Sequence, residues 1–320
     1  MIIVLGAAFV TAALLAVVAH LVDSKRQVVL VAGALARVPM LGSIPGAILL
    51  TFGLGWTGAV IGGGVILAAA WTQAPLRIRR FRRRPASGTP FTVLHANILL
   101  GQADTEAIIA LLDKHEPDVL TVVELTPQAH QRLLAAGLLD RLPESFVSPA
   151  AGGNGTGIYS RHPLSDLERH DGYVTELLSA RVHVPGGASP LVFAAHPVPP
   201  WPRRPEAWVR ELAAIGQMLS KIPDDDGPVV VAGDFNATYD HKRYRDLCTD
   251  GFRDAAMEVG AGHLATYHAD WKLAFPLATL RLPPLIAIDH VLVRGASVTE
   301  VGVVDLPGSD HRGIRCSLVL

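Results

Sequence analysis

The sequence predicts an α/β protein, a layered sandwich of strands and helices preceded by membrane-spanning helices. Three observations support this prediction. The first 74 of the 320 residues consist mainly of long apolar stretches. After residue 90, short continuous apolar runs typical of buried strands alternate with helical patterns. Polar side chains follow these runs repeatedly at their carboxyl ends, where sites are assembled on a rigid sheet.

The formal net charge of −1 is the sum of two opposed parts. Residues 1–89 hold nine basic side chains and one acid, which gives +8, whereas residues 90–320 have a net charge of −9. The composition excludes a disordered chain, a collagen-like repeat and a disulfide scaffold. Cys248 and Cys316 cannot form a cysteine-based zinc site alone, and they are either two free thiols or one disulfide. Cys316 lies in an alternating apolar pattern that favours a buried thiol.

Two stretches of the N-terminal part are long enough to cross a membrane. Residues 2–22 and 44–71 contain no Asp, Glu, Lys or Arg, and about 20 apolar residues suffice for a spanning helix. Residues 28–36 are also apolar and form either a short third span or a re-entrant or interfacial piece. A cleaved signal peptide fits poorly because the N-terminus lacks basic residues. We therefore expect a transmembrane helical anchor over residues 1–74, in a multi-pass protein of the cell membrane.

Basic residues bear on the topology of this anchor. A basic run at residues 77–84 lies in the linker that we expect over residues 75–90. With three spans, Lys25 and Arg26 lie on the same side as this run, and the positive-inside rule places both in the cytoplasm. With two spans, Lys25 and Arg26 lie on the opposite side of the membrane from this run. The rule then does not decide on which side the C-terminal domain lies. The run either binds anionic lipid head groups or acts as a stop-transfer linker.

The remaining elements follow from the period of the apolar residues. Helical spacing indicates three helices, and Pro117 ends the first of them. These helices are expected at residues 105–115, 127–136 and 206–221. Continuous apolar runs predict strands buried on both faces. They are expected at residues 91–97, 118–124, 157–160, 191–196, 228–233, 286–293 and 312–320.

Several predicted strands end in side chains that suit one chemistry. They are Asn97, Glu124, His196, Asp234, Asn236, Asp289, Asp310 and His311. A carboxylate such as Glu124 suits a hard cation such as Mg²⁺. The histidines suit proton transfer or phosphate contact, and Asp289 could hold His311 in one tautomer. Taken singly, Asn97 and Asn236 also fit turn formers. Together the set favours metal-assisted phosphoester hydrolysis.

Three tetrapeptides make this interpretation more specific. Residues 233–236 read Gly-Asp-Phe-Asn, residues 288–291 read Ile-Asp-His-Val, and residues 309–312 read Ser-Asp-His-Arg. They resemble, in the same order, the three C-terminal motifs of the endonuclease/exonuclease/phosphatase superfamily. The strand ends at Asn97, Glu124 and His196 and the Tyr-Ser-Arg-His-Pro segment at 159–163 are similar to its other motifs. The resemblance covers about residues 90–320.

This resemblance implies a four-layer α/β sandwich, two packed mixed sheets flanked by helices, as a catalytic domain over residues 91–320. It implies a hydrolase of phosphoester bonds that requires Mg²⁺ or Mn²⁺. Glu124 would bind the metal, helped by Asn97 and Asp310. The segment after Asn97, Ile-Leu-Leu-Gly, lacks the further acid that some members carry there.

The resemblance also implies roles in catalysis. His311, oriented by Asp289, would activate water as the general base or contact the phosphate. Asp234 would orient the nucleophile or assist the leaving group. The catalytic set is therefore His311, Asp289, His196, Asp234 and Asn236. The residues implied to bind phosphate are Asn97, Asn236 and His196.

The substrate stays open between nucleic acid, a phospholipid head group and a small phosphodiester. A net charge of −9 argues against a high-affinity nuclease, because nucleic-acid binding depends on neutralising phosphates. Arg203 and Arg204 follow His196 and either contact a phosphate or anionic head group or lie in a loop without a ligand. The expected partners are the substrate and the lipid bilayer, and no protein partner follows from the sequence. The alternative function is a catalytically weak binding or sensor module with the same fold.

Overall fold

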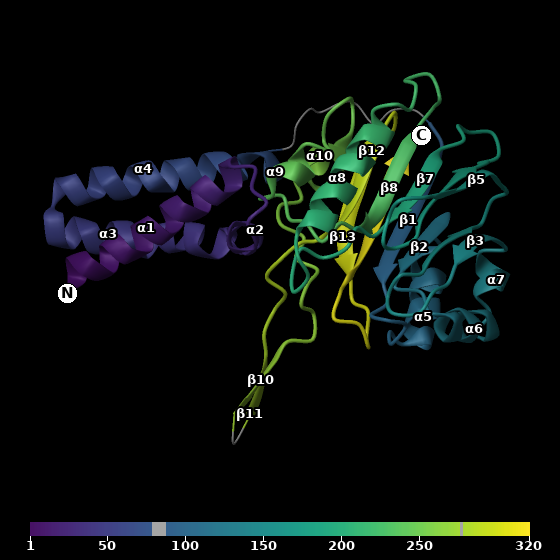
Figure 1. Ribbon diagram of the computed structural model, residues 1–320, viewed down its shortest axis with the longest axis horizontal. Coiled ribbons are helices and arrows are strands. Elements are labelled where there is room, and N and C mark those ends of the chain that lie inside the picture. The colour runs from purple at the N-terminus through teal and green to yellow at the C-terminus, as the bar shows by residue number, and fades with distance from the viewer. Residues whose placement is uncertain (79–87, 276–277) are drawn as a thin grey trace.

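The computed structural model describes residues 1–78, 88–275 and 278–320, without the side chains of residues 272–275, 278–279 and 281. Residues 79–84 of the basic run, and most of the linker expected at 75–90, lie outside the described residues. A bundle of N-terminal helices stands beside a layered α/β sandwich, and the N-terminus lies at the end of the bundle far from the sandwich (Figure 1).

The first sheet has six strands in the order β13-β14-β1-β2-β4-β3. Their bounds are β1 Pro90–Asn97, β2 Val119–Val123, β3 Glu144–Ser148, β4 Thr156–Ser160, β13 Ser297–Val304 and β14 Gly313–Val319. Strands β1 and β2 are parallel, so their carboxyl ends lie side by side. The neighbouring β14 runs antiparallel to β1, and its first residues therefore lie near the same edge.

The second sheet also has six strands, in the order β5-β6-β7-β8-β12-β9. Their bounds are β5 Leu164–His170, β6 Leu177–Val182, β7 Leu191–Ala195, β8 Val229–Asp234, β9 Arg253–Asp254 and β12 Asp289–Arg294. Strands β7 and β8 are parallel. Strand β12 runs antiparallel to β8, with Asp289 opposite Asp234. A separate hairpin of β10 (Lys272–Phe275) and β11 (Ala278–Arg281) projects from the sandwich (Figure 1).

Helices cover the outer faces of both sheets, which confirms the predicted four-layer sandwich. One apolar cluster lies between the sheets and includes Val93 and Val230. On the first sheet's outer face lie α5 (Thr105–His115), α6 (Pro127–Ala135) and α7 (Leu138–Arg141). On the second lie α8 (Glu206–Leu219) and α9 (Lys242–Arg245), and α10 (Ala255–Val259) contacts β12 and β13.

Local sequence explains where the predicted helices begin and end. The Asp104 side chain accepts hydrogen bonds from the backbone N–H groups of residues 106 and 107, which caps α5. Thr126 caps α6 in the same way, and Pro127 occupies the first helical position. Both cysteines are free thiols, and Cys316 is buried between the sheets, as its alternating pattern predicts.

The apolar stretch at residues 44–71, expected as one span, is divided between two antiparallel helices. Helix α3 covers Arg37–Leu54, and α4 covers Trp56–Gln73. Gly55 separates them with a φ of 62°, a conformation that glycine adopts readily. The hydropathy of the sequence does not predict this division, because both helices are apolar. Helix α4 continues into a short 3₁₀ turn, η1 (Ala74–Leu76).

Close approach of backbones explains the glycines of α4. A Cβ atom added at Gly58 would lie 2.1 Å from the Leu50 carbonyl oxygen, and one at Gly62 would lie 2.3 Å from the Ala47 Cβ. Small residues at such positions allow apolar helices to pack tightly in a membrane. Residues 28–36 belong mainly to α2 (Gln27–Ala34), whose eight residues are too few to cross a bilayer.

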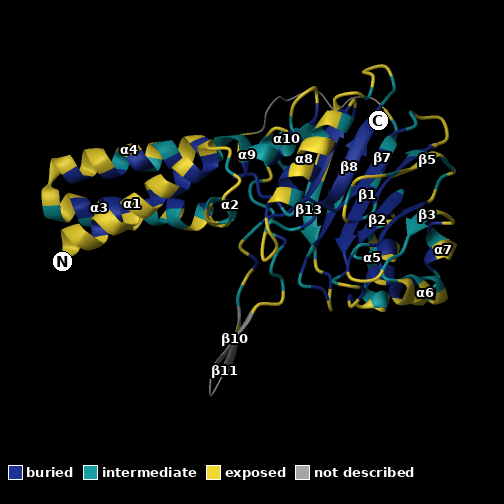
Figure 2. Ribbon diagram, viewed as in Figure 1, coloured by how far each residue is buried: buried dark blue, intermediate teal, exposed yellow. Residues whose placement is uncertain are grey.

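Among the residues that the structure describes, three helical segments are long and apolar enough to cross a membrane: Ile2–Leu21 (α1), Arg37–Leu54 and Trp56–Leu76. They pack against one another, yet only 22–33% of each apolar window is buried, and exposed residues line the outside of the bundle (Figure 2). In this arrangement the chain passes along the bundle three times. The end of α1 near Lys25 and the end of α4 near Arg77 therefore both lie beside the sandwich (Figure 1).

Candidate active site

The polar strand ends converge at one edge of the sandwich. The parallel pairs β1/β2 and β7/β8 bring four carboxyl ends together. The antiparallel strand β12 adds its first residue, Asp289, opposite the last residue of β8, Asp234. Along β1 the side chains of residues 93, 95 and 97 share the face toward the second sheet, because side chains alternate in a strand. The site therefore lies between the two sheets.

Asn97 lies at the centre of this group and is completely buried. Its Nδ2 atom donates to Glu124 Oε1 at 3.1 Å and to Asp234 Oδ2 at 3.0 Å, and it lies 3.5 Å from His311 Nε2. Its Oδ1 atom accepts a hydrogen bond from the backbone N–H of Leu99. These contacts join the end of β1 to β2, β8 and the loop before β14.

Asp289 and His311 form a buried pair, with Asp289 Oδ2 2.8 Å from His311 Nδ1. This contact holds the imidazole so that Nε2 faces the site, 3.7 Å from Asp234 Oδ2. The second Asp289 oxygen, Oδ1, lies 3.4 Å from Nε2 of His95. The ring of Tyr267 packs against the His311 ring with centroids 4.9 Å apart.

The pair shifts both pKa values. Burial alone would lower the pKa of His311, but the negative charges of Asp289 and Asp234 outweigh it and raise the pKa to about 10. Burial alone would raise the pKa of Asp289, yet the neighbouring His311 charge and hydrogen bond hold that pKa far below its usual value. At neutral pH His311 therefore carries a proton and Asp289 is ionised.

The pKa values of Asp234 and His196 are both shifted in the direction that favours the uncharged side chain. Burial, followed by the negative charge of Asp289, raises the pKa of Asp234 to about 7. Burial lowers the pKa of His196 to about 4, against the opposing effect of Glu124. His196 Nε2 lies 3.7 Å from Asp234 Oδ2 and 3.9 Å from Glu124 Oε1. The lowered pKa leaves the His196 imidazole neutral at pH 7.

Oxygen ligands for a metal ion are present in the group. Glu124 follows β2 with a φ of 58°, uncommon for a residue other than glycine, and its Oε2 accepts the N–H of Leu100 at 2.7 Å. Asp310 Oδ1 is buried without a hydrogen-bond partner among the described residues, and burial raises the pKa of this carboxyl.

A second observation also points to a cation. Asp234, Asp289 and His311 each place one ligand atom within 4.8 Å of the others, and all three side chains are buried. Buried carboxylates in such a group repel one another unless a cation or proton is present. The proton on His311 balances the charge of Asp289, so the remaining carboxylates at this edge, those of Asp234, Glu124 and Asp310, are the charges that a hard divalent cation would balance.

Asn236 and the segment at residues 159–163 have other partners. Asn236 lies beside the group, and its Nδ2 donates to the carbonyl oxygen of Pro197 at 3.0 Å, while its N–H donates to Asp234 Oδ1. The Tyr159 hydroxyl contacts His130 Nδ1 at 2.7 Å in the cluster under α5–α7, outside the site. His162 pairs with Asp118.

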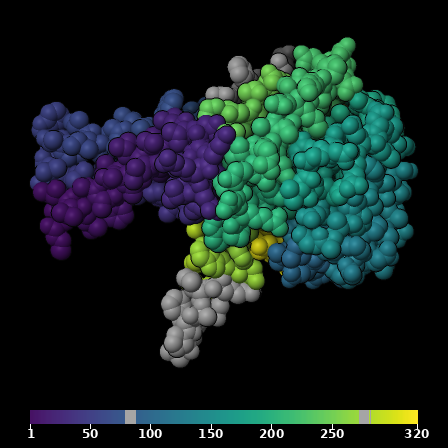
Figure 3. All heavy atoms as spheres, in the orientation of Figure 1, coloured from purple at the N-terminus to yellow at the C-terminus, as the bar shows by residue number. Residues whose placement is uncertain are grey.

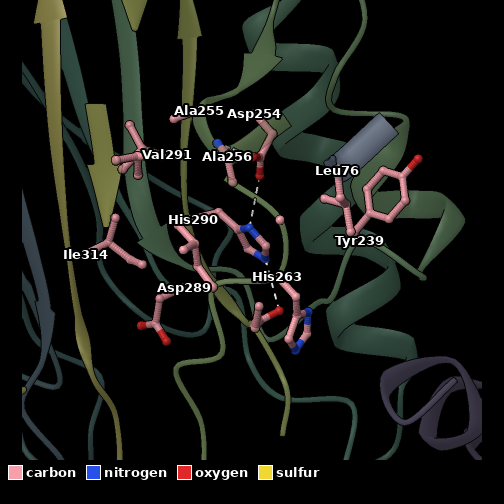
Figure 4. A pocket seen from close by; sticks show the side chains of 14 residues that line it. Leu76, Tyr239, Asp254, Ala255, Ala256, His263, Asp289, His290, Val291 and Ile314 are labelled. Carbon is pink, nitrogen blue, oxygen red and sulfur yellow. Dashed lines mark hydrogen bonds and ion pairs between the residues drawn. The ribbon is translucent and has the colours of Figure 1, made fainter. Parts of the chain in front are cut away.

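His290 lies next to Asp289 but projects to the other side of β12 (Figure 4). Its Nδ1 lies 3.0 Å from Asp254 Oδ2 and its Nε2 lies 2.9 Å from the carbonyl oxygen of Ala237. These contacts agree with the structural role that the alternation of a strand predicts. His290 and Asp254 line a small pocket, and Leu76, which follows α4, also lines it (Figure 4).

Three residues near the site were not predicted. His95 precedes Asn97 by two positions on β1, so the period of two could have placed it on the same face. Tyr267 and His268 lie in a loop far from any motif. His268 Nε2 lies 3.9 Å from Asp310 Oδ2, and only the fold brings these residues together.

Comparison with known proteins identifies the family. A family model described as the Endonuclease/Exonuclease/phosphatase family matches residues 94–311. The chain belongs to this family. It is accordingly a hydrolase that acts on phosphoester bonds. The comparison with curated proteins gives no match. Residues 1–93, including the N-terminal helices, lie outside the matched range.

Solved structures share the fold at low sequence identity. The D. rerio TDP2 complexed with single-strand DNA product has a TM-score of 0.57 and 18% identity, over 72% of this chain and 100% of that chain. The 3′-5′ exonuclease NExo from Neisseria meningitidis has a TM-score of 0.55 and 18% identity, over 71% and 98%. The mannosyl-6-phosphatase Bt3783 of Bacteroides thetaiotaomicron has a TM-score of 0.53 and 16% identity, over 72% and 100%. These likenesses establish the fold, which an exonuclease and a mannosyl-6-phosphatase share.

Proposed function

We propose that the protein is a membrane-anchored, Mg²⁺-dependent phosphoester hydrolase, which Mn²⁺ would also support. Residues 1–74 would form the anchor, 75–90 the linker and 91–320 the catalytic domain. The observation that supports the proposal most directly is the buried group at one sandwich edge. There Asn97 Nδ2 contacts both Glu124 and Asp234, and His311 faces the same point.

In this proposal Glu124 binds the cation, helped by Asp310, and Asn97 helps by holding the Glu124 carboxylate through the hydrogen bond that its Nδ2 donates. Asp289 and His311 face each other at 2.8 Å, so the carboxylate oxygens left for a hard cation belong to Glu124 and Asp310. Bound there, a divalent cation would supply Lewis-acid stabilisation of negative charge on the phosphoryl oxygens. An oxygen-only set of this kind is typical of Mg²⁺ rather than Zn²⁺.

The pKa values favour one of the two roles predicted for His311. A histidine that already holds a proton at neutral pH is a poor base, so His311 donates to the phosphate or to the departing ester oxygen. Asp234, with a pKa raised to about 7, is suited to take the proton of the attacking water. The water oxygen bonds to phosphorus while the ester P–O bond breaks, and the leaving oxygen takes a proton from His311.

The remaining predicted residues bind and orient the phosphoryl group. His196 is neutral and buried, and its Nδ1 has no hydrogen-bond partner among the described residues. Nδ2 of Asn236 holds Pro197 through one hydrogen and retains a second to donate. Neutral donors bind phosphate oxygens without competing for the proton or the metal.

The three apolar helices support the membrane part of the proposal. A three-pass path places Lys25, Arg26 and Arg77 on the side of the sandwich, so the positive-inside rule puts the catalytic domain in the cytoplasm. The exposed apolar surface of the bundle fits contact with lipid tails.

The test uses the full-length protein in detergent with bis(p-nitrophenyl) phosphate and p-nitrophenyl phosphate. We expect hydrolysis in Mg²⁺ or Mn²⁺ and none in EDTA. His311→Ala should lower turnover by roughly 10²- to 10⁴-fold. Glu144→Gln, an exposed carboxylate on β3, is the matched control. Absence of metal-dependent hydrolysis of these esters, of DNA and of phospholipid would favour the alternative, a binding or sensor module.

A further inference from the structure

The loop at residues 197–205 joins the candidate active site to the membrane helices. It follows His196, and the Pro197 carbonyl accepts the Asn236 side chain at 3.0 Å. The N–H of Val198 donates to the buried Glu211 of α8 at 2.8 Å. At its other end, Gln27 Nε2 donates to the carbonyl oxygens of Pro200 (3.1 Å) and Arg203 (2.9 Å). Both ends of the loop are therefore held in place.

Gln27 is the first residue of α2, and Arg26 is its N-cap. Helix α1 ends six residues earlier at Leu21, where an apolar spanning helix leaves the hydrocarbon core. Helix α2 lies between the bundle and the sandwich (Figure 1), and this end of the bundle abuts the sandwich surface (Figure 3). The contacts of Gln27 consequently hold the loop at the level of the lipid head groups.

We propose that this region is a binding surface for anionic phospholipid head groups and that it presents a membrane phospholipid to the site. The proposal rests on the proposed hydrolase function. We call the surface the interfacial patch and define it as Lys25, Arg26, Trp201, Arg203 and Arg204. It deepens the function by naming the substrate class, a phosphoester that remains in the bilayer.

The side chains of the interfacial patch are free to bind a ligand. All five are exposed, and 63% of Trp201 is accessible. Within the described part of the chain, the four basic side chains make no hydrogen bond or ion pair. The neighbouring acid, Asp23, is paired with Arg243 at 2.8 Å. Four positive charges thus remain on a chain whose residues 90–320 have a net charge of −9.

The chemistry of the patch matches a membrane surface. Tryptophan is enriched at the level of the head groups, because its ring has an apolar body and a polar N–H. Lysine and arginine near the bilayer are attracted to anionic lipids, and arginine can donate two parallel hydrogen bonds to one phosphate. The patch shows one exposed aromatic side chain among its basic residues, whereas single-stranded nucleic acid is bound by a series of stacking rings.

The patch lies within reach of the site. Trp201 follows His196 by five positions, and an extended chain covers at most about 3.6 Å per residue. Trp201 is therefore no more than about 18 Å from His196 along the loop. A phosphate held beside the patch can approach His196 without its acyl chains leaving the bilayer.

The experiment uses the full-length protein in nanodiscs of phosphatidylcholine, with and without phosphatidylglycerol. Arg203→Ala/Arg204→Ala is compared with Arg203→Lys/Arg204→Lys, which keeps the charge. Lys114→Ala/Lys221→Ala removes two exposed basic side chains on α5 and after α8 and is the matched control. Hydrolysis of phosphatidylglycerol, of bis(p-nitrophenyl) phosphate and of single-stranded DNA is measured for each variant, together with hydrogen exchange of residues 197–205.

We expect phosphatidylglycerol to protect residues 197–205 from exchange in the wild type. The double alanine variant should lose this protection, and its hydrolysis of phosphatidylglycerol relative to bis(p-nitrophenyl) phosphate should fall at least tenfold. The Arg203→Lys/Arg204→Lys variant should retain most of the protection from exchange and most of the phosphatidylglycerol hydrolysis. An unchanged ratio, protection that does not depend on phosphatidylglycerol, or a selective loss of DNA cleavage would overturn the proposal. Absence of hydrolysis of the soluble ester by the wild type would instead contradict the proposed function.

Discussion

His20 Nδ1 lies 2.7 Å from Asp240 Oδ1, although 220 positions separate the two residues. Both side chains are buried, and Gln73 of α4 also donates to Asp240 Oδ1, at 2.8 Å. Asp240 follows Asn236 by four residues, in the loop that leaves the candidate active site. The N-terminal helices thus contact this loop directly and are more than a tether.

The first prediction concerns this contact. His20→Ala should lower the free energy of unfolding by about 1–3 kcal/mol, because a buried carboxylate loses one of its partners. Turnover should fall as well, because the loop that carries Asn236 and Asp240 loses its contact with His20. The midpoint of thermal inactivation of the full-length protein in detergent measures the first effect. His115→Ala, on α5, is the control, and equal midpoints for both variants would refute the coupling.

The second prediction concerns the packing of α3 against α4. Gly58→Ala should lower the midpoint of thermal unfolding, because its Cβ would collide with the Leu50 carbonyl oxygen. Gly64→Ala lies on the same helix with open space around it. It should have no adverse effect, since alanine favours a helix over glycine by about 1 kcal/mol. If the two variants behaved alike in detergent, the hairpin packing would be wrong.

The third prediction concerns the metal. Glu124→Gln should raise the free Mg²⁺ concentration needed for half-maximal activity by roughly 10- to 100-fold or more, because replacing even a residue that only orients a metal ligand weakens metal affinity by that factor. A titration of activity against free Mg²⁺ measures this, with Glu144→Gln as the control. An unchanged Mg²⁺ dependence would exclude Glu124 as a metal ligand.

The fourth prediction concerns the pH dependence of turnover. Asp289 is the main reason that the pKa of His311 is raised to about 10. Asp289→Asn removes this negative charge, so the pKa of His311 should fall. If protonated His311 is the active form, activity at high pH should be lost at a lower pH in the variant. The pH–rate profile of both proteins shows this, and an unshifted alkaline limb would argue for His311 as the base.

The fifth prediction concerns stability against pH. Burial opposes charge on both members of the Asp254–His290 pair, but their mutual hydrogen bond outweighs it. The pKa of Asp254 is lowered, so its contribution is present above about pH 3.9 and is lost as the pH falls further. The pKa of His290 is raised, so its contribution is complete below about pH 6.5 and is lost as the pH rises through the raised value.

The pair should therefore stabilise the fold most between about pH 4 and 6.5. His290→Gln should lower the free energy of unfolding by about 3 kcal/mol in this window and by less on either side. Unfolding midpoints measured across this pH range test the expectation. A uniform loss at every pH would show that packing, rather than the ion pair, accounts for the effect.

The strands that the sequence predicted are those with continuous apolar runs, and most of them are central. The missed strands include β13, β3, β5 and β9, the four edges of the two sheets. An edge strand is half-exposed and often charged, as in Leu164–His170, so its pattern resembles that of a loop. The sequence left open whether the two cysteines form a disulfide. They are free thiols, because Cys316 lies in the cluster between the sheets and Cys248 packs against the separate cluster under α8.

The opposed charges of the two parts, the buried strands and the polar residues at their ends were determined by the sequence alone, since burial and alternation leave a local pattern. That pattern was enough to predict a layered α/β sandwich with polar residues gathered at its strand ends. The four-layer arrangement followed only from the resemblance of the motifs to a known family. The tertiary structure decided what depends on distant segments meeting: the close packing of α3 on α4, the approach of Tyr267 to the Asp289–His311 pair, and the contact of His20 with Asp240. Such contacts arise from packing between elements, and no local property of either partner records them.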